Sequence, residues 1–177
     1  MEFTLKKEIK MDTTVAELLN DYKGMKDILI SINPKFKKLN NPILRRTLAK
    51  LATVKQAAII GGMDAYELLN KLRVAVGQEP IQADEKEQIV IDETKPTWAE
   101  KEPIAVLNAN ELLDKGKNPL AEAHQLLRKL KGDEFIKIVS DFRPEPLIEE
   151  FEKQGYEVAS FTDDGKIFFT TIKRKTT

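Results

Sequence analysis

Cysteine is absent from the 177-residue sequence. A chain without thiols forms no disulfide, has no thiolate nucleophile and offers no cysteine ligand to zinc or to an iron–sulfur cluster. Nothing in this composition calls for an oxidising compartment, so we expect a cytoplasmic protein. The N-terminal residues MEFTLKKEIKMD lack the apolar core of a signal peptide, and no stretch approaches the roughly 18 apolar residues of a membrane span.

The sequence is also poor in catalytic groups. His124 is the single histidine, and the residues around it supply no set of three or four metal ligands at matching spacing. The sequence motifs of serine hydrolases, P-loop proteins, dinucleotide-binding folds and zinc proteases are missing. Asp163 and Asp164 form a carboxylate pair, but the Asp-Gly turn that follows explains them. We therefore expect no enzyme activity, no cofactor and no metal.

Charge is balanced over the whole chain but not along it. Residues 1–78 carry 14 Lys and Arg against 8 Asp and Glu, whereas residues 79–103 carry 3 against 8. A basic excess of this size suits a nucleic-acid surface, and it is also typical of an ordinary solvated face.

Residues 1–78 predict a small all-α helical bundle. Its helices are short, each starts at a capping residue, and apolar residues follow the caps at helical spacing. A basic loop with Lys35, Lys37 and Lys38 separates the second helix from the third, which carries Leu44, Leu48 and Leu51. The predicted starts are Thr14 with Glu17, Met25, Asn41 with Pro42, Thr53 with Gln56, and Asp64 with Glu67.

Residues 79–103 have the acidic, proline-containing composition of a linker. Two features depart from that pattern: Ile89 to Ile91 is a β-prone triplet, and Trp98 is the only tryptophan. A large apolar side chain in a linker usually packs on a neighbouring domain, so we expect Trp98 to dock. Recognition of a partner is the alternative.

Residues 104–177 predict strands and helices in the order β-α-β-α-β-β. The strands are expected at 104–107, 135–140, 156–161 and 167–172, and the helices at 119–130 and 144–155. Asp164-Gly165 is a strong hairpin signal between the last two strands. The fold class is therefore α+β: a helical bundle followed by a two-layer sandwich with a mixed sheet and both helices on one face.

Residues 53–76 have the outline of a helix-turn-helix, two short helices around a glycine turn. The second helix would present Tyr66, Glu67, Asn70 and Lys71 outward. Acidic residues at its N-terminal end, Asp64 and Glu67, would repel phosphates. Two packed helices of a bundle are the structural alternative, and nucleic-acid binding is the less favoured one.

The C-terminal part, about residues 104–174, resembles an uncharacterised bacterial and archaeal domain related to the TusA/SirA sulfur-carrier proteins. LNANELLDKGKNPLAEAHQLLRKL, FRPEPL and the QGY step carry the resemblance. The resemblance implies a β-α-β-α-β-β sandwich. Those carriers place a Cys-Pro-x-Pro motif at the start of the first helix, where this chain has Asn118-Pro119-Leu120-Ala121. A persulfide relay needs a thiolate, so the resemblance does not extend to that chemistry.

Residues 11–76 resemble a helical domain related to the redox-disulfide domain associated with hybrid-cluster proteins. TTVAELL, FKKLNNPILRRTLAKLATVKQAA and the GGMD turn carry the resemblance. The cysteine pair of the redox form is missing, so the chain resembles the cysteine-free branch. This implies a place in redox or nitrogen-oxide metabolism without supplying a mechanism.

We therefore expect a non-enzymatic protein-binding or accessory protein in redox or sulfur-related metabolism, with a DNA-binding regulator that uses residues 53–76 as the alternative. Sulfur carriers dock through the start of their first helix. The expected partner surface therefore combines the start of the first helix with the turn after the second strand. The helix that starts beside an arginine at this turn is also a poor candidate for an anion site. The residues of the expected partner surface are Asn118, Pro119, Phe142, Arg143 and Pro144.

Overall fold

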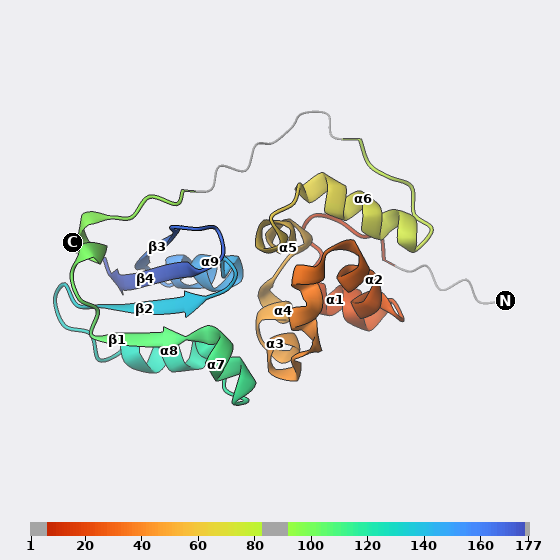
Figure 1. The fold of residues 1–177 in the computed structure, drawn as a ribbon. Coiled ribbons are helices and arrows are strands. Elements are labelled where there is room, and N and C mark those ends of the chain that lie inside the picture. The colour runs from red at the N-terminus through yellow and green to blue at the C-terminus, as the bar shows by residue number, and fades with distance from the viewer. Residues whose placement is uncertain (1–6, 83–91, 176–177) are drawn as a thin grey trace. The chain divides into compact units, whose positions relative to one another are not determined.

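The computed structural model describes residues 7–82 and 92–175 (Figure 1). It divides into two compact units, residues 1–87 and residues 88–177, hereafter unit 1 and unit 2. Unit 1 is helical and unit 2 contains a four-stranded mixed sheet, which confirms the α+β class. No helix in the described ranges combines the length and apolarity needed to cross a bilayer. The β-prone Ile89 to Ile91 lies outside the described residues.

The helices of unit 1 begin where the capping residues predict. Thr14 with Glu17 and Thr53 with Gln56 form complete capping boxes, and the Asp64 side chain accepts from the Glu67 N–H at 3.0 Å. The α-helices are α1 (Val15–Asp21), α2 (Met25–Ile32), α3 (Pro42–Arg46), α4 (Leu48–Leu51), α5 (Val54–Gly61) and α6 (Ala65–Ala75), with a 3₁₀ helix η1 (Pro34–Asn40).

Two details of unit 1 correct the sequence analysis. The expected basic loop is the 3₁₀ helix η1, which starts where the Asn33 side chain accepts from the Lys35 N–H at 3.0 Å. The expected third helix is two helices, because Thr47 leaves the helical region with φ −116° and ψ −83°. Its hydroxyl donates to the Ile43 carbonyl at 2.7 Å, a local bond of the kind that bends or ends helices.

The N-termini of α1 and α5 are tied together by backbone hydrogen bonds. Val15 N–H donates to Ala52 O at 2.8 Å, and Val54 N–H donates to Thr13 O at 2.9 Å. Leucines and one methionine from α1, α2 and α6 form much of the core of unit 1, together with Ile9 and Val54. The buried leucines and methionine are Leu18, Met25, Leu29, Leu68, Leu69 and Leu72.

One buried arginine of α6 binds two separate segments of unit 1. Arg73 donates through Nε to Glu79 O at 2.6 Å and through Nη1 to Ile9 O at 2.7 Å, and its Nη2 lies 2.8 Å from the Glu8 carboxylate. Gln78 accepts from the Ile9 N–H at 2.9 Å. Arg73 therefore fastens the first described segment and the segment after α6 to the same helix.

Unit 2 is built on a sheet of order β1-β2-β4-β3. Its strands are β1 (Ala105–Asn108), β2 (Phe135–Ser140), β3 (Tyr156–Thr162) and β4 (Phe168–Arg174), with β1 parallel to β2 and the other pairs antiparallel. The helices are α7 (Ala109–Asp114), α8 (Pro119–Leu127) and α9 (Glu145–Lys153). α7 was not expected, so the observed order is β-α-α-β-α-β-β.

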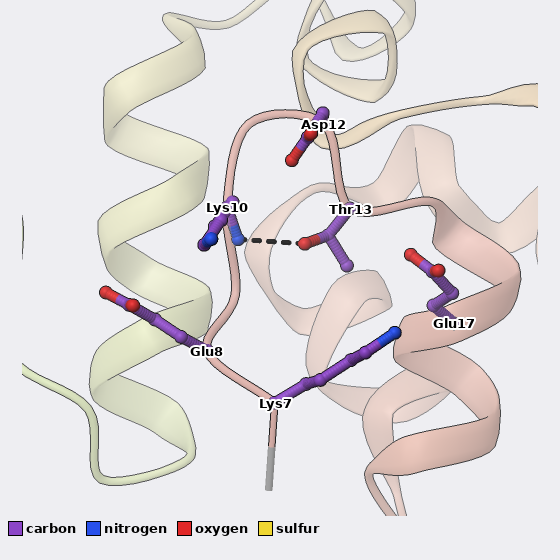
Figure 2. Close-up of a pocket in the computed structure, with 6 residues that line it drawn as sticks. All are labelled: Lys7, Glu8, Lys10, Asp12, Thr13 and Glu17. Carbon is purple, nitrogen blue, oxygen red and sulfur yellow. Dashed lines mark hydrogen bonds between the residues drawn. The ribbon is translucent and has the colours of Figure 1, made fainter.

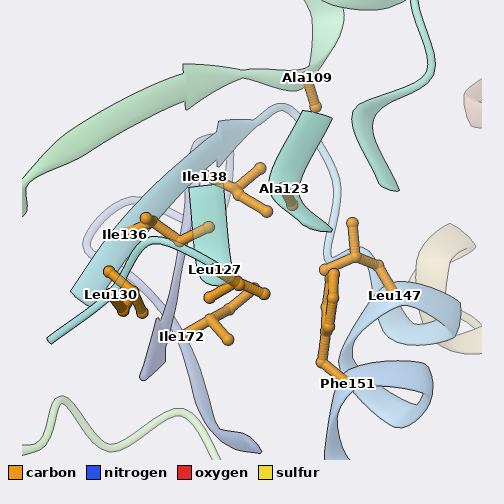
Figure 3. Close-up of a cluster of buried hydrophobic side chains, with 9 residues drawn as sticks. All are labelled: Ala109, Ala123, Leu127, Leu130, Ile136, Ile138, Leu147, Phe151 and Ile172. Atoms are coloured by element: carbon orange, nitrogen blue, oxygen red, sulfur yellow. The ribbon is translucent and has the colours of Figure 1, made fainter. Parts of the chain in front are cut away.

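The core of unit 2 lies between one face of the sheet and helices α8 and α9, as expected for a sandwich (Figure 3). Ile136 and Ile138 of β2 point to these helices, and Leu127 and Phe151 meet them from α8 and α9. Because strand side chains alternate, Phe135, Lys137 and Val139 point to the opposite face, which we call the open face.

Residues 92–103, which we call the strap, cover part of the open face. They contain a short 3₁₀ helix, η2 (Thr97–Glu100). The Trp98 ring meets the edge of Phe135 with centroids 5.4 Å apart, and Ala99 retains 3% of its exposure. Trp98 therefore does dock, on the sheet of unit 2.

Candidate functional site

The residues expected to form a partner surface are mostly interior. Asn118 caps α8, its side chain accepting from the Leu120 N–H at 3.0 Å, and the following Pro119 is buried. Phe142 retains 3% of its exposure, and Pro144 is also buried. The apolar area that we expected Phe142 to offer is therefore not available, because the fold uses it for packing.

Arg143 is buried in unit 2, and its guanidinium binds groups of the same unit. Nε lies 2.8 Å from the Glu145 carboxylate, and Nη1 donates to Ser160 O at 3.3 Å and to Asp92 O at 3.5 Å. Arg143 thus joins the turn before α9, strand β3 and the start of the strap. This is the structural turn, with Glu145 in the place that an anion would need.

The ionisation of nearby carboxyls follows from this arrangement. The Thr94 N–H and hydroxyl hold the pKa of Asp92 below its ordinary value, and the Arg143 charge adds to that effect. On α9, partial burial raises the pKa of Glu152, and the charges of Glu145 and Glu149 raise it further.

The other candidates for chemistry have structural explanations. Asp164 accepts from the N–H groups of Ile167 and Lys166, and these bonds lower the pKa of its carboxyl. The His124 ring packs on Phe151 with centroids 4.9 Å apart. Throughout residues 7–82 and 92–175, no group of three His, Cys, Asp or Glu side chains is placed to hold a metal ion.

A polar hollow of about 340 Å³ lies beside the first described segment of unit 1 (Figure 2). Part of its lining is already engaged: the Thr13 hydroxyl accepts from the Lys10 N–H at 2.9 Å, Glu8 pairs with Arg73, and Glu17 caps α1. Both carboxylates and ammonium groups line the hollow, so it has no single charge with which to select a ligand. Its lining residues are Lys7, Glu8, Lys10, Asp12, Thr13 and Glu17.

A groove of about 540 Å³ between α2 and α6 was not expected from the sequence. Ile28 and Ile32 of α2 are half-buried along it, and Val74 of α6 leaves 60% of its surface exposed. Together with Ala75, these side chains make the groove mainly apolar. The lining residues are Ile28, Ser31, Ile32, Asn70, Lys71, Val74 and Ala75.

The spacing of apolar residues on α2 carried a signal for this groove. Met25, Ile28, Leu29 and Ile32 recur at helical spacing, but only Met25 and Leu29 are buried. Ile28 and Ile32 are one turn apart and flank the buried pair, so the apolar face is wider than the core requires. The excess width lines the groove.

The same groove contains residues expected to face DNA. The Asn70 amide donates to Ile81 O at 2.9 Å, and its carbonyl accepts from the Ile81 N–H at 2.8 Å. Lys71 lies 3.0 Å from the Glu67 carboxylate. The side chains of Asn70 and Lys71 are therefore bound within the chain, and Val74, one turn further along α6, is exposed.

Comparison with known protein families gives a match within unit 1. Residues 9–69 match the family model described as Domain of unknown function (DUF1858). This range runs from the segment bound by Arg73 through α5 and into α6, so it agrees with the expected N-terminal helical domain. No curated protein and no solved structure gives a significant match to the chain. These residues of unit 1 are therefore similar to a DUF1858 domain.

Proposed function

We propose that this chain is a non-enzymatic protein-binding or accessory protein that receives a helix of its partner in the groove between α2 and α6. The observation that carries the proposal is the exposure of Val74 beside the half-buried Ile28 and Ile32. Exposed apolar side chains that line a groove between two helices are typical of sites that bind the apolar face of a third helix.

The groove supports a protein partner better than a nucleic acid. Duplex recognition needs basic groups for phosphates and free hydrogen-bonding side chains for base edges. In this groove Lys71 is paired with Glu67, and both polar atoms of the Asn70 amide are bonded to Ile81. DNA binding by residues 53–76 stays the alternative, with less support from the geometry.

The metabolic setting is a proposal that rests on resemblance. Residues 11–76 resemble a redox-associated domain and residues 104–174 resemble a domain related to sulfur carriers, so we propose a partner in redox or sulfur-related metabolism. The chain has no cysteine, and the position of the carrier thiol is held by Asn118, which caps α8. The proposed role is therefore to bind a protein and not to relay a persulfide.

Replacing Val74 with glutamate tests the groove. A buried carboxylate is costly in an apolar interface, so partner capture by the full chain from native lysate should fall about tenfold or more. The thermal midpoint should hold, because Val74 is exposed. Lys55→Glu, an exposed position on α5, is the matched control and should leave capture unchanged. Capture that is equal for both variants would overturn the groove as the partner site.

A further inference from the structure

The strap makes specific side-chain contacts with the open face of unit 2. The Trp98 ring lies on the edge of Phe135, and the Lys173 ammonium lies over the Trp98 ring at 5.0 Å from its centroid. Toward the other edge of the sheet, the Lys95 ammonium lies 5.5 Å from the centroid of Phe161. Aromatic edge-to-face and cation–π contacts are each worth about 1 kcal/mol.

Side chains, and not backbone pairing, hold the strap to the sheet. Within residues 92–103 the Ala99 N–H donates to Pro96 O, a backbone hydrogen bond internal to the strap. The first backbone bond to the sheet comes at Ile104, whose N–H donates to Phe135 O at 2.9 Å. At its other end the strap is joined through Asp92 O to Arg143. The strap therefore sits on the sheet as a bound peptide does, and it is not an added strand.

The face beneath the strap is suited to such an occupant. Phe135 and Phe161 supply two aromatic surfaces, with exposures of 1% and 6% under the strap. Lys173 is held between the Trp98 ring and the Glu157 carboxylate, whose oxygen lies 3.6 Å from the ammonium. An aromatic ring that enters this place therefore meets an edge-on phenyl group and a positioned cation.

We propose that the open face of unit 2 is a docking site for an extended, tryptophan-bearing segment of a partner protein, and that residues 92–100 mask it in the free chain. The seated strap shows the chemistry that fits: a tryptophan with a lysine three residues before it and a proline between them. The site lies wholly within unit 2 and does not depend on the groove of unit 1.

We take the partner to be a different protein, because the strap of a second copy would bind the face no more tightly than the tethered strap does. A tethered segment acts at an effective concentration of about millimolar, and the strap of another copy offers only the same contacts without the tether. Exchange between copies is therefore disfavoured at micromolar concentrations. A foreign segment displaces the strap only by binding the face more tightly than the strap does.

The sole tryptophan makes the test direct. The full-length Trp98→Ala variant contains no tryptophan, so a synthetic peptide of residues 92–101, DETKPTWAEK, supplies all of the indole fluorescence in a mixture. Docking should shift that emission to the blue and saturate. With a fluorescein-labelled copy of the peptide, anisotropy should show about tenfold tighter binding to Trp98→Ala than to the wild-type chain, because the tethered strap competes in the latter.

Matched variants complete the test. Glu100→Ala changes an exposed residue of η2 and should bind the peptide as weakly as wild type does. Lys173→Glu added to Trp98→Ala should abolish binding, as should replacing the peptide's tryptophan with alanine. Lys95→Ala keeps the Trp98 ring in place and should show intermediate binding, which covers the case in which Trp98→Ala fails to fold.

Two results would overturn the proposal. The first is equal peptide binding by wild type and the folded Trp98→Ala variant, because the strap would then mask nothing. The second is a concentration-dependent dimer of the wild-type chain that Trp98→Ala abolishes, because the occupant would then be a second copy.

Discussion

Each unit of the molecule has one buried arginine that joins separate segments of the chain, but the two arginines have different partners. Arg73 of unit 1 binds the carbonyls of Ile9 and Glu79 and pairs with Glu8, whose side chain is 54% exposed. Arg143 of unit 2 binds the carbonyls of Ser160 and Asp92 and pairs with Glu145, whose side chain is 14% exposed.

The difference shows that similar geometry can have different energetics. When the carboxylate is exposed, water solvates it whether or not the arginine is present, so the pair contributes little and the bonds to backbone carbonyls dominate. When the carboxylate is buried, removing the arginine leaves a charge with little solvent to stabilise it. Arg143 should therefore be the more sensitive of the two positions.

Replacing Arg143 with alanine should give the largest effect. The loss leaves Glu145 unpaired and frees the start of the strap, so the free energy of unfolding of unit 2 should fall by about 3 kcal/mol. Urea unfolding monitored by Trp98 fluorescence measures it, because the only tryptophan lies in unit 2.

The double variant Arg143→Met with Glu145→Leu is the control for Arg143→Ala. It removes both charges together, so it should recover most of the lost stability. A double variant as unstable as Arg143→Ala would mean that the hydrogen bonds to the strap and to β3, and not the ion pair, dominate.

Replacing Arg73 with alanine should have the next largest effect, about 2 kcal/mol in unit 1, because the buried carbonyl of Ile9 and the partly buried carbonyl of Glu79 lose their donor. Hydrogen exchange monitored by mass spectrometry should show faster exchange in residues 7–13 and 78–82. Glu8→Gln serves as the matched variant and should cost less than about 0.5 kcal/mol, since its carboxyl is more than half exposed. If Glu8→Gln matched Arg73→Ala, the contrast between the two arginines would fail.

Local signals in the sequence predict the start of most elements. The two capping boxes of unit 1 involve residues three apart, and the Asn118-Pro119 start of α8 involves neighbours, so no tertiary information is needed. α7 was missed although Asn108 caps it by accepting from the Glu111 N–H at 3.1 Å. It is only six residues long and directly follows a strand, so its periodicity is too brief to detect.

The candidate sites depended on contacts that the sequence does not place. Arg143 reaches Ser160 and Asp92, which are 17 and 51 residues away, and these partners decide that it is interior. The burial of Phe142 has the same tertiary origin. The groove depends on which apolar residues of α2 and α6 pack in the core and which stay exposed to solvent. The lone tryptophan predicted that the strap packs on a domain, but the sequence did not show which face of the sheet the strap covers.

The smallest expected effect concerns Glu152, near the ion pair of unit 2. Burial and the charges of Glu145 and Glu149 raise its folded-state pKa above the ordinary value of 4.5, so the folded protein holds this proton more tightly than the unfolded chain does. The ionised carboxyl therefore destabilises the fold above the raised pKa, and the penalty is absent below 4.5, where both states are protonated. Glu152→Gln should raise the thermal midpoint slightly at pH 7, and the gain should vanish near pH 3.5.

Water screens this largely exposed residue, which keeps the effect small. Glu111→Gln, at an exposed position on α7, is the control. If the rise in thermal midpoint of Glu152→Gln persisted at pH 3.5, the rise would come from helix propensity and not from the charges that surround Arg143.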